Sequence, residues 1–355
     1  MVGKGWRSAM RLTANHLTVL RVALLPLPYF LVYGGKMERV AAVAAFAVLG
    51  ITDYLDGLLA RRDGGTKLGA LLDPLADKIF AAVTLIPIVD LRILPMWVVW
   101  PIFLREFLVT EMRRFLLVER LELPVTELAK IKTTLQMTGA GLILLTDVFP
   151  DKTVSAAFLS GALLASLFLA IGLYWRNGYV SERIKTALGF LVLGLFVLIF
   201  FSAPTANLVY GIVMLGITFI SAWRYITAGL PACAKKGLLV QGRLILALAF
   251  PLIPLGLMTN VQTGVTGVVV FIIVFEFVAQ GIDMWALKEG LVDMAWVKPF
   301  VCLPAGMVIL AIGVNIFGSS DGIRLYLLAT SLMSGGYLIL DGLIHRRLIW
   351  RQRCI

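Results

Sequence analysis

Long apolar segments constrain this chain more than any other feature of its sequence. Runs of roughly 17–25 apolar residues can cross the hydrocarbon core of a bilayer as an α-helix, and about twelve such runs can be placed along the chain. Hydrophobic residues make up 60% of the 355 residues and charged ones 15%, a balance that excludes a water-facing globular surface. We therefore predict an all-α integral membrane protein. The predicted spans are residues 17–34, 40–58, 69–90, 95–116, 133–149, 154–174, 187–201, 205–222, 244–259, 264–286, 299–317 and 325–344.

The net charge of +11 indicates membrane topology rather than nucleic-acid binding. With a cytoplasmic N-terminus, most of the 32 Lys and Arg residues fall in or beside loops and termini on the inner side, as the positive-inside rule requires. We therefore predict a multi-pass protein of the cytoplasmic (inner) membrane with both termini in the cytoplasm. The C-terminal tail would then meet anionic lipid headgroups with Arg346, Arg347, Arg351 and Arg353.

A polar stretch at residues 176–185 interrupts the apolar pattern after the sixth predicted span. The segments before this stretch carry several charges at membrane depth, whereas those after it are mostly apolar. We therefore predict two domains, a six-helix catalytic bundle at residues 1–180 and a second, roughly six-helix transmembrane bundle at residues 181–355. The sequence assigns no function to the second.

Four aspartates on two consecutive apolar segments form the most informative pattern. Asp53 and Asp56 are three residues apart, and Asp73 and Asp77 are four apart, so each pair projects from one face of a helix. Hard carboxylate oxygens in this number predict a site for Mg²⁺ or Mn²⁺. The alternative, ordinary helix-end charges facing water, would place four charges on apolar helices at about 2.5–3.5 kcal/mol each with no compensating benefit.

Residues between these pairs suit a diphosphate ligand. Gly57 and Gly69 lack side chains, so the backbone can approach a phosphate or a neighbouring helix closely. Arg61 can fork onto phosphate oxygens. The order Asp53-x-x-Asp56-Gly57-x-x-Ala60-Arg61, seven residues, then Gly69-x-x-x-Asp73-x-x-x-Asp77 resembles the signature of the CDP-alcohol phosphatidyltransferase family.

That resemblance implies a six-helix membrane fold with a polar cavity open to the cytoplasm. It implies two divalent metal ions held by the four aspartates, with Asp77 also acting as the general base. The CDP-diacylglycerol substrate is expected to contact seven further residues: Asn15, Thr18, Gly57, Ala60, Arg61, Thr66 and Gly69.

Residues 14–180 further resemble one branch of the family, the phosphatidylglycerophosphate synthases, which use sn-glycerol 3-phosphate as acceptor. The matching segments are residues 15–21, preceded by Ala14 in place of the usual proline, Arg105-Glu106 with Arg113, and residues 130–136. This resemblance implies that the acceptor phosphate is held by Arg21, Arg105, Arg113, Lys130 and Lys132.

The positions of these cations also indicate their roles on physical grounds. Arg105 is predicted deep in a span, where a charge lines a cavity or is paired. Glu106 projects about 100° away, so we expect the partner of Arg105 to be another residue. Topology-setting at the cytoplasmic interface is an alternative role for Lys130 and Lys132.

Other readings of the chain stay open. The same chemistry could use phosphatidylglycerol or an inositol phosphate as acceptor, and a transporter or scaffold could keep a vestigial enzyme half. Glu276 and Asp283 are seven residues apart on one predicted span, and we favour a helix–helix contact over a polar cavity for them. The expected partners are the two substrates and membrane lipids, without nucleic acid; a homodimer is compatible with the sequence.

Overall fold

A computed structural model describes residues 13–63, 66–120, 127–236, 238–258 and 265–288, and every regular element in them is an α-helix. The helices are α1 (Ala14–Leu24), α2 (Pro26–Leu31), α3 (Lys36–Asp63), α4 (Lys67–Asp90), α5 (Met96–Val118), α6 (Glu127–Val148), α7 (Lys152–Asn177), α8 (Glu182–Phe200), α9 (Ala203–Ala234), α10 (Leu238–Leu257) and α11 (Thr266–Lys288).

Each predicted span up to residue 286 overlaps one of these helices, except the first, although some helices extend further: α9 ends at Ala234, whereas its predicted span ends at residue 222. The first span is divided into α1 and α2 at Leu25, because Pro26 begins a new helix and its ring removes a backbone donor from a continuing one. The spans predicted at 299–317 and 325–344, and with them the second six-helix bundle as a whole, lie outside the described residues.

The protein is a multi-pass membrane protein. Five of the described helices, α7 to α11, combine the length and the apolar composition that a membrane span requires. On α7 only 17% of the apolar window is buried inside the protein, so most of its side chains face outward, as expected for a helix in lipid. Helices α4 and α5 are of similar length but carry charged residues in their interior.

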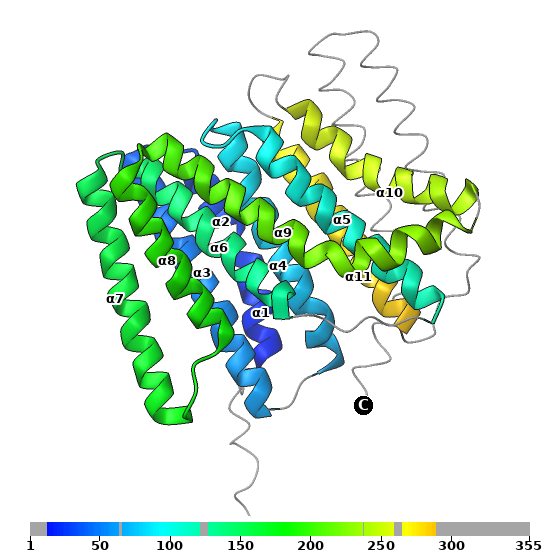
Figure 1. Cartoon of the computed structure of the whole chain (residues 1–355), viewed down its shortest axis with the longest axis horizontal. Helices are drawn as coiled ribbons and strands as arrows, with labels where there is room; N and C mark the ends of the chain where they lie inside the picture. The colour runs from blue at the N-terminus through cyan, green and yellow to red at the C-terminus, as the bar shows by residue number, and fades with distance from the viewer. Residues whose placement is uncertain (1–12, 64–65, 121–126, 237, 259–264, 289–355) are drawn as a thin grey trace, which may run out of the picture.

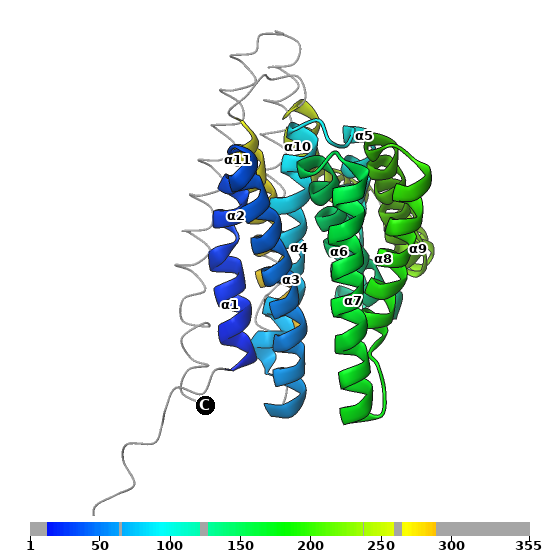
Figure 2. The same cartoon turned by 90° about the vertical axis from the view of Figure 1, so that its left-hand side faces the viewer.

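The helices form a flattened bundle (Figure 1), in which α9 runs across the molecule from the side of α8 to that of α10. The main packing partners of α9 are α5 and α6, while α1 packs on α3 and α4, and α11 packs along α4. Figure 2 shows α1 and α2 near one edge, α6, α7 and α8 on the opposite side, and α3 and α4 between them.

The core lies along α4 and α5. Ile102, Phe103 and Phe107 on α5, and Leu85 and Ile86 on α4, are completely buried. Charged residues of α5 share this interior, since Arg105, Glu106, Glu111 and Arg114 are also buried. The fold therefore brings costly polar groups to the same depth as its tightest apolar packing.

Small residues let α6 approach α8 and α9 closely. A Cβ atom at Gly139 of α6 would lie 2.9 Å from Cγ of Met214 and 3.2 Å from Cε1 of Phe190. A Cβ atom at Gly141, on the same helix, would meet nothing within 4 Å. The two glycines thus differ in packing but share a helix.

We expect Gly139→Val to reduce the free energy of unfolding by about 1–3 kcal/mol through overpacking. Gly141→Val is the matched control, because it makes the same change in helix propensity without a clash. Thermal unfolding of both variants in detergent measures the difference. Equal losses at the two positions would contradict this account of the α6 contact.

Candidate functional site

The sequence signature folds onto the end of α3 and the beginning of α4. Asp53 lies on α3, and Asp73 and Asp77 lie on α4. Asp56, Gly57, Ala60 and Arg61 also belong to α3, but their side chains, like that of Lys130 on α6, are outside the described part of the structure. The roles predicted for these five residues stay predictions.

Three of the residues predicted to contact the CDP-lipid meet where α4 begins. Thr66 is the N-cap of α4, and its hydroxyl accepts a hydrogen bond from the Gly69 amide at 2.9 Å. The same hydroxyl donates to Oδ1 of Asn15 on α1 at 3.0 Å. A Cβ atom at Gly69 would lie 2.9 Å from that Asn15 oxygen. The junction fixes α4 against α1, so Asp73 and Asp77, about one and two turns further along α4, are held in register.

The described carboxylates gather around two arginines, and we call this group of Asp53, Asp73, Asp77, Arg21 and Arg183 the carboxylate cluster. Nη1 of the fully buried Arg21 donates to Oδ1 of Asp53 and lies 3.8 Å from Oδ1 of Asp77. Nη1 of Arg183, at the start of α8, lies 2.9 Å from Oδ2 of Asp53. Four helices therefore contribute to the cluster.

Thr18 closes the cluster on the side of α1. Its hydroxyl donates to Oδ1 of Asp73 at 3.2 Å and is buried. Thr18 was predicted to contact the CDP-lipid, and Arg21 to hold the acceptor phosphate. In the structure both side chains contact the aspartates, which places them at the predicted metal ligands.

A second group surrounds Glu106, and we call Glu106, Arg105, Lys132, Lys78 and Arg113 the cation cluster. Oε1 of Glu106 lies 2.6 Å from Nζ of Lys132 on α6 and 3.1 Å from Nη1 of Arg105. All three side chains are buried. Ion pairs at this depth need close geometry, because low-dielectric surroundings penalise an unpaired charge strongly.

The expectation that Arg105 pairs with a residue other than Glu106 is wrong for one of its nitrogens. Nη1 contacts Glu106, whereas Nη2 donates to Oγ of Ser221 on α9 at 2.7 Å. The two side chains are long enough to bend into the same space between helices although their Cβ atoms diverge. Ser221 lies 116 residues away in the sequence, so sequence spacing gave no signal for it.

Lys78 and Arg113 complete the cation cluster. Nζ of Lys78 donates to Oγ1 of Thr110 on α5, and the charges that act on it are those of Glu106, Lys132, Arg113 and Arg105. The Arg113 guanidinium stacks over the Tyr225 ring with its Cζ 4.6 Å from the centroid. Lys78 follows Asp77 directly in the sequence but could not be placed at the site from spacing, because neighbours on a helix project in different directions.

The carboxylate cluster and the cation cluster adjoin, and they differ in which sign of charge predominates. Lys132 interacts electrostatically with both Glu106 and Asp77. In the cation cluster four cations face one described carboxylate. This excess positive charge favours an anionic ligand next to Asp77.

The carboxylate cluster has features of a divalent-metal site. No group of three or more His, Cys, Asp or Glu side chains is arranged as a metal site in the described ranges, which leave out the Asp56 side chain. Oδ1 of Asp77 is buried without a hydrogen-bond partner, and the Asp53 carboxylate contacts two arginines. A buried carboxylate oxygen without a hydrogen-bond partner, in a group with two further carboxylates, suits a hard cation such as Mg²⁺.

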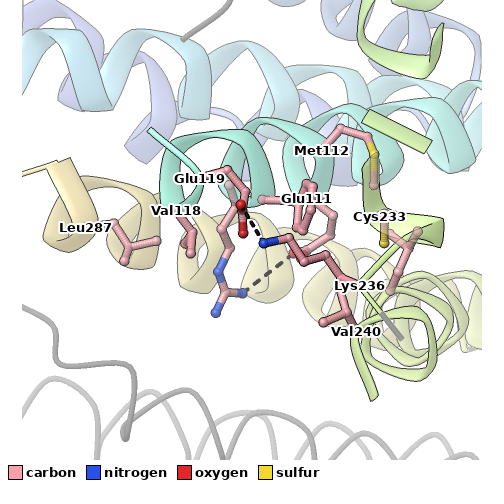
Figure 3. Close-up of a pocket in the computed structure, with 11 residues that line it drawn as sticks. Glu111, Met112, Val118, Glu119, Cys233, Lys236, Val240 and Leu287 are labelled. Atoms are coloured by element: carbon pink, nitrogen blue, oxygen red, sulfur yellow. Dashed lines mark ion pairs between the residues drawn. The ribbon is translucent and has the colours of Figure 1, made fainter. Parts of the chain in front are cut away.

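A separate cavity of about 130 Å³ lies between α5, α9, α10 and α11 (Figure 3). An ion pair of 2.7 Å between Lys236 and Glu119 crosses it. Nη2 of Arg114, which also lines it, lies 3.4 Å from Oδ2 of Asp283 on α11. This ion pair agrees with the helix–helix contact favoured for Asp283. Among the predicted substrate and metal residues whose side chains the structure describes, none lines the cavity.

Comparison with known proteins identifies a family over most of the chain. Residues 11–223 match the family described as CDP-alcohol phosphatidyltransferase. A probable phosphatidylglycerophosphate synthase of Mycobacterium tuberculosis is 37% identical over 163 residues, which cover 44% of this chain and 78% of the relative. A CDP-diacylglycerol--glycerol-3-phosphate 3-phosphatidyltransferase of Bacillus subtilis is 32% identical over 190 residues, 49% of this chain and 97% of the relative. No solved structure matches the chain.

The cation cluster predicts a large effect of removing one negative charge. We expect Glu106→Gln to reduce the free energy of unfolding by about 3–5 kcal/mol, because it leaves buried cations uncompensated. Glu119→Gln is the control, since its ion pair with Lys236 is partly exposed and is worth at most about 1 kcal/mol. Thermal unfolding of the ligand-free variants compares the two, and similar shifts would show that Glu106 does not balance the cluster.

Proposed function

This chain belongs to the CDP-alcohol phosphatidyltransferase family, and from that premise we propose that it transfers the phosphatidyl group of CDP-diacylglycerol to sn-glycerol 3-phosphate. The products would be phosphatidylglycerophosphate and CMP. The family establishes an enzyme of phospholipid biosynthesis whose substrates are a CDP-activated lipid and an alcohol. The choice of a phosphorylated acceptor rests on the site.

The observation that carries the choice is the excess of positive charge around Glu106. Lys78, Arg105, Lys132 and Arg113 outnumber their one described carboxylate, and Lys132 also acts on Asp77. A phosphomonoester brings up to two negative charges and three acceptor oxygens, so it matches this cluster better than a neutral alcohol does. The names of the Mycobacterium and Bacillus relatives support glycerol 3-phosphate among phosphorylated acceptors.

Asp53, Asp56, Asp73 and Asp77 would hold the divalent metal, Mg²⁺ or Mn²⁺, and two ions are expected. Bound there, the metal would supply charge neutralisation for the diphosphate. Arg21 and Arg183 contact Asp53 in the structure. Both arginines are therefore near enough to the carboxylates to meet diphosphate oxygens when a substrate occupies the site.

The reaction needs a base beside the attacking oxygen. Asp77 would accept the proton of the acceptor hydroxyl, while the hydroxyl oxygen forms a bond to the β-phosphorus, which carries the diacylglycerol. The bond from that phosphorus to the oxygen of CMP breaks, and CMP leaves with the electron pair. Arg105, Lys132 and Lys78 would hold the acceptor phosphate, so that the hydroxyl at its other end faces Asp77.

The orientation of the protein in the membrane forms part of the same proposal. The site would face the cytoplasm, where CDP-lipid headgroups and sugar phosphates meet, with both termini on that side.

The domain boundary at residue 180 stays a prediction. Ser221 and Arg183 both come from helices beyond it and contact residues of the two clusters, so the working unit would extend past that boundary.

An acceptor screen tests the function. Purified protein with CDP-diacylglycerol and Mg²⁺ should release CMP rapidly with sn-glycerol 3-phosphate, and far more slowly with glycerol or phosphatidylglycerol. The physical reason is the phosphomonoester charge, which only the first acceptor offers to the cation cluster. Preference for glycerol would contradict a phosphate site, preference for phosphatidylglycerol would indicate cardiolipin formation, and preference for an inositol phosphate would keep the phosphate site but change the product.

The role of the base is tested by Asp77→Asn. The substitution keeps the shape of the side chain but removes its basicity, so turnover should fall by about 10²–10⁴-fold in a folded, membrane-inserted protein. Asp147→Asn is the control, because Asp147 is a half-buried aspartate paired with Arg39 at 2.8 Å on another helix. An Asp77→Asn enzyme that keeps more than about a tenth of normal activity would remove Asp77 from this role.

A further inference from the structure

Helix α11 lies outside the part of the chain that matches the family, yet it touches the cation cluster. The family match ends at residue 223, whereas α11 spans Thr266–Lys288 and packs along α4. Nζ of Lys78, on α4, lies 5.0 Å from the centroid of the Phe277 ring on α11. A cation at this distance over an aromatic face is attracted by the ring quadrupole.

The Phe277 ring is held in a fixed position. It is 1% exposed and stacks on Phe107 of α5, with centroids 4.4 Å apart and planes inclined by 14°. Phe103 lies on the same face of α5 with its ring 6.4 Å from Phe277. A ring enclosed in this way cannot turn aside when the charge above it moves.

Polar contacts fix α11 on both sides of Phe277. Toward its beginning, Thr266 donates a hydrogen bond to Oδ2 of Asp90 at the end of α4. Toward its other end, Asp283 pairs with Arg114 of α5. Between these contacts, Gly281 faces Leu71 and Leu75 of α4, with an added Cβ 3.6 Å from Cδ1 of Leu71. These contacts fix the distance between α11 and α4, and with it the position of Phe277 relative to Lys78.

Lys78 has the properties of a ligand-binding cation. Within the described ranges no carboxylate lies within ion-pair distance of its Nζ, which donates to the neutral Thr110 hydroxyl. Thr110 in turn donates to the backbone carbonyl of Glu106, which orients its oxygen toward Lys78. A half-buried ammonium held by a ring and a hydroxyl keeps donor capacity for an anion.

We propose that α11 forms a wall of the acceptor site and that Phe277 is a positioning residue for Lys78, whose ammonium binds the acceptor phosphate. The inference rests on the proposed function, because it assigns the phosphate to the cation cluster. It gives part of the C-terminal half a task in substrate selection. Phe277 acts through Lys78 and touches neither substrate.

The test compares acceptor kinetics of the full-length protein with those of Phe277→Leu. Leucine keeps the site apolar but removes the ring, so the apparent KM for sn-glycerol 3-phosphate should rise about 2- to 30-fold, the range that corresponds to a cation–π interaction of about 0.5–2 kcal/mol. The KM for CDP-diacylglycerol should stay within about twofold, because that lipid binds elsewhere. Phe271→Leu is the matched control, since Phe271 is on the same helix and 45% exposed.

A double-mutant cycle separates positioning from a structural role. In a Lys78→Met background, Phe277→Leu should change the KM for glycerol 3-phosphate by less than about twofold, because the ammonium on which the ring acts is gone. If Phe277→Leu raises KM by the same factor in both backgrounds, or leaves KM unchanged in the parent, the positioning role is wrong. Should Phe277→Leu fail to fold, Phe277→Met provides the same comparison.

The acceptor preference of the parent enzyme keeps the two proposals distinguishable. A parent that does not prefer a phosphorylated acceptor overturns the proposed function, and with it the phosphate role of Lys78. A parent that prefers glycerol 3-phosphate, combined with a Phe277→Leu variant of unchanged KM, overturns only the role of α11. A preference for glycerol 3-phosphate together with a KM effect that depends on Lys78 supports both.

Discussion

The arrangement around the site depends on the ion pairs that the Glu106 carboxylate forms with Arg105 and Lys132. In a low-dielectric interior an unpaired ion costs several kcal/mol, so helices α5 and α6 can turn cations inward only if a counter-charge accompanies them. Glu106 supplies it to Arg105 on its own helix and to Lys132 on α6. Because Arg105 also binds Ser221, this one carboxylate links the packing of α5, α6 and α9.

Neither cluster is electrically balanced: negative charge is in excess in the carboxylate cluster, and positive charge is in excess in the cation cluster. These opposite excesses indicate which ligands the site can bind. Around the aspartates, Arg21 and Arg183 supply part of the positive charge that carboxylates on apolar helices need. Around Glu106, cations are in excess. A metal-bound diphosphate and a phosphorylated alcohol would complete both balances. Their binding free energy would then include relief of the cost of buried, partly compensated charge.

Much of this arrangement could be predicted from the sequence. The residues that could not be predicted reach the site only through packing between distant helices. Apolar length predicts where the helices lie, closely for residues 69–90 and α4 at Lys67–Asp90, less closely for residues 205–222 and α9, which continues to Ala234. The spacing of Asp53, Asp73 and Asp77 predicts that they share a site because it depends only on helix periodicity and one short turn. Arg183, Ser221 and Phe277 could not be found in this way, since each reaches the site through packing between helices far apart in the sequence. Arg183 reads as a topology-setting cation, and Phe277 as one apolar residue among many.

The packing of α11 indicates that the chain beyond the family match contributes to the site. A C-terminal group of helices with no role in the catalytic domain would need no polar contact with that domain inside the membrane, because each such contact must overcome the cost of desolvation. Instead Asp283 on α11 pairs with Arg114, and Phe277 on α11 lies under Lys78. Contacts within one chain do not dissociate on dilution in the membrane, because the linker holds the partners at high effective concentration. A wall supplied by α11 would therefore keep the acceptor site in one geometry regardless of how much protein the membrane contains.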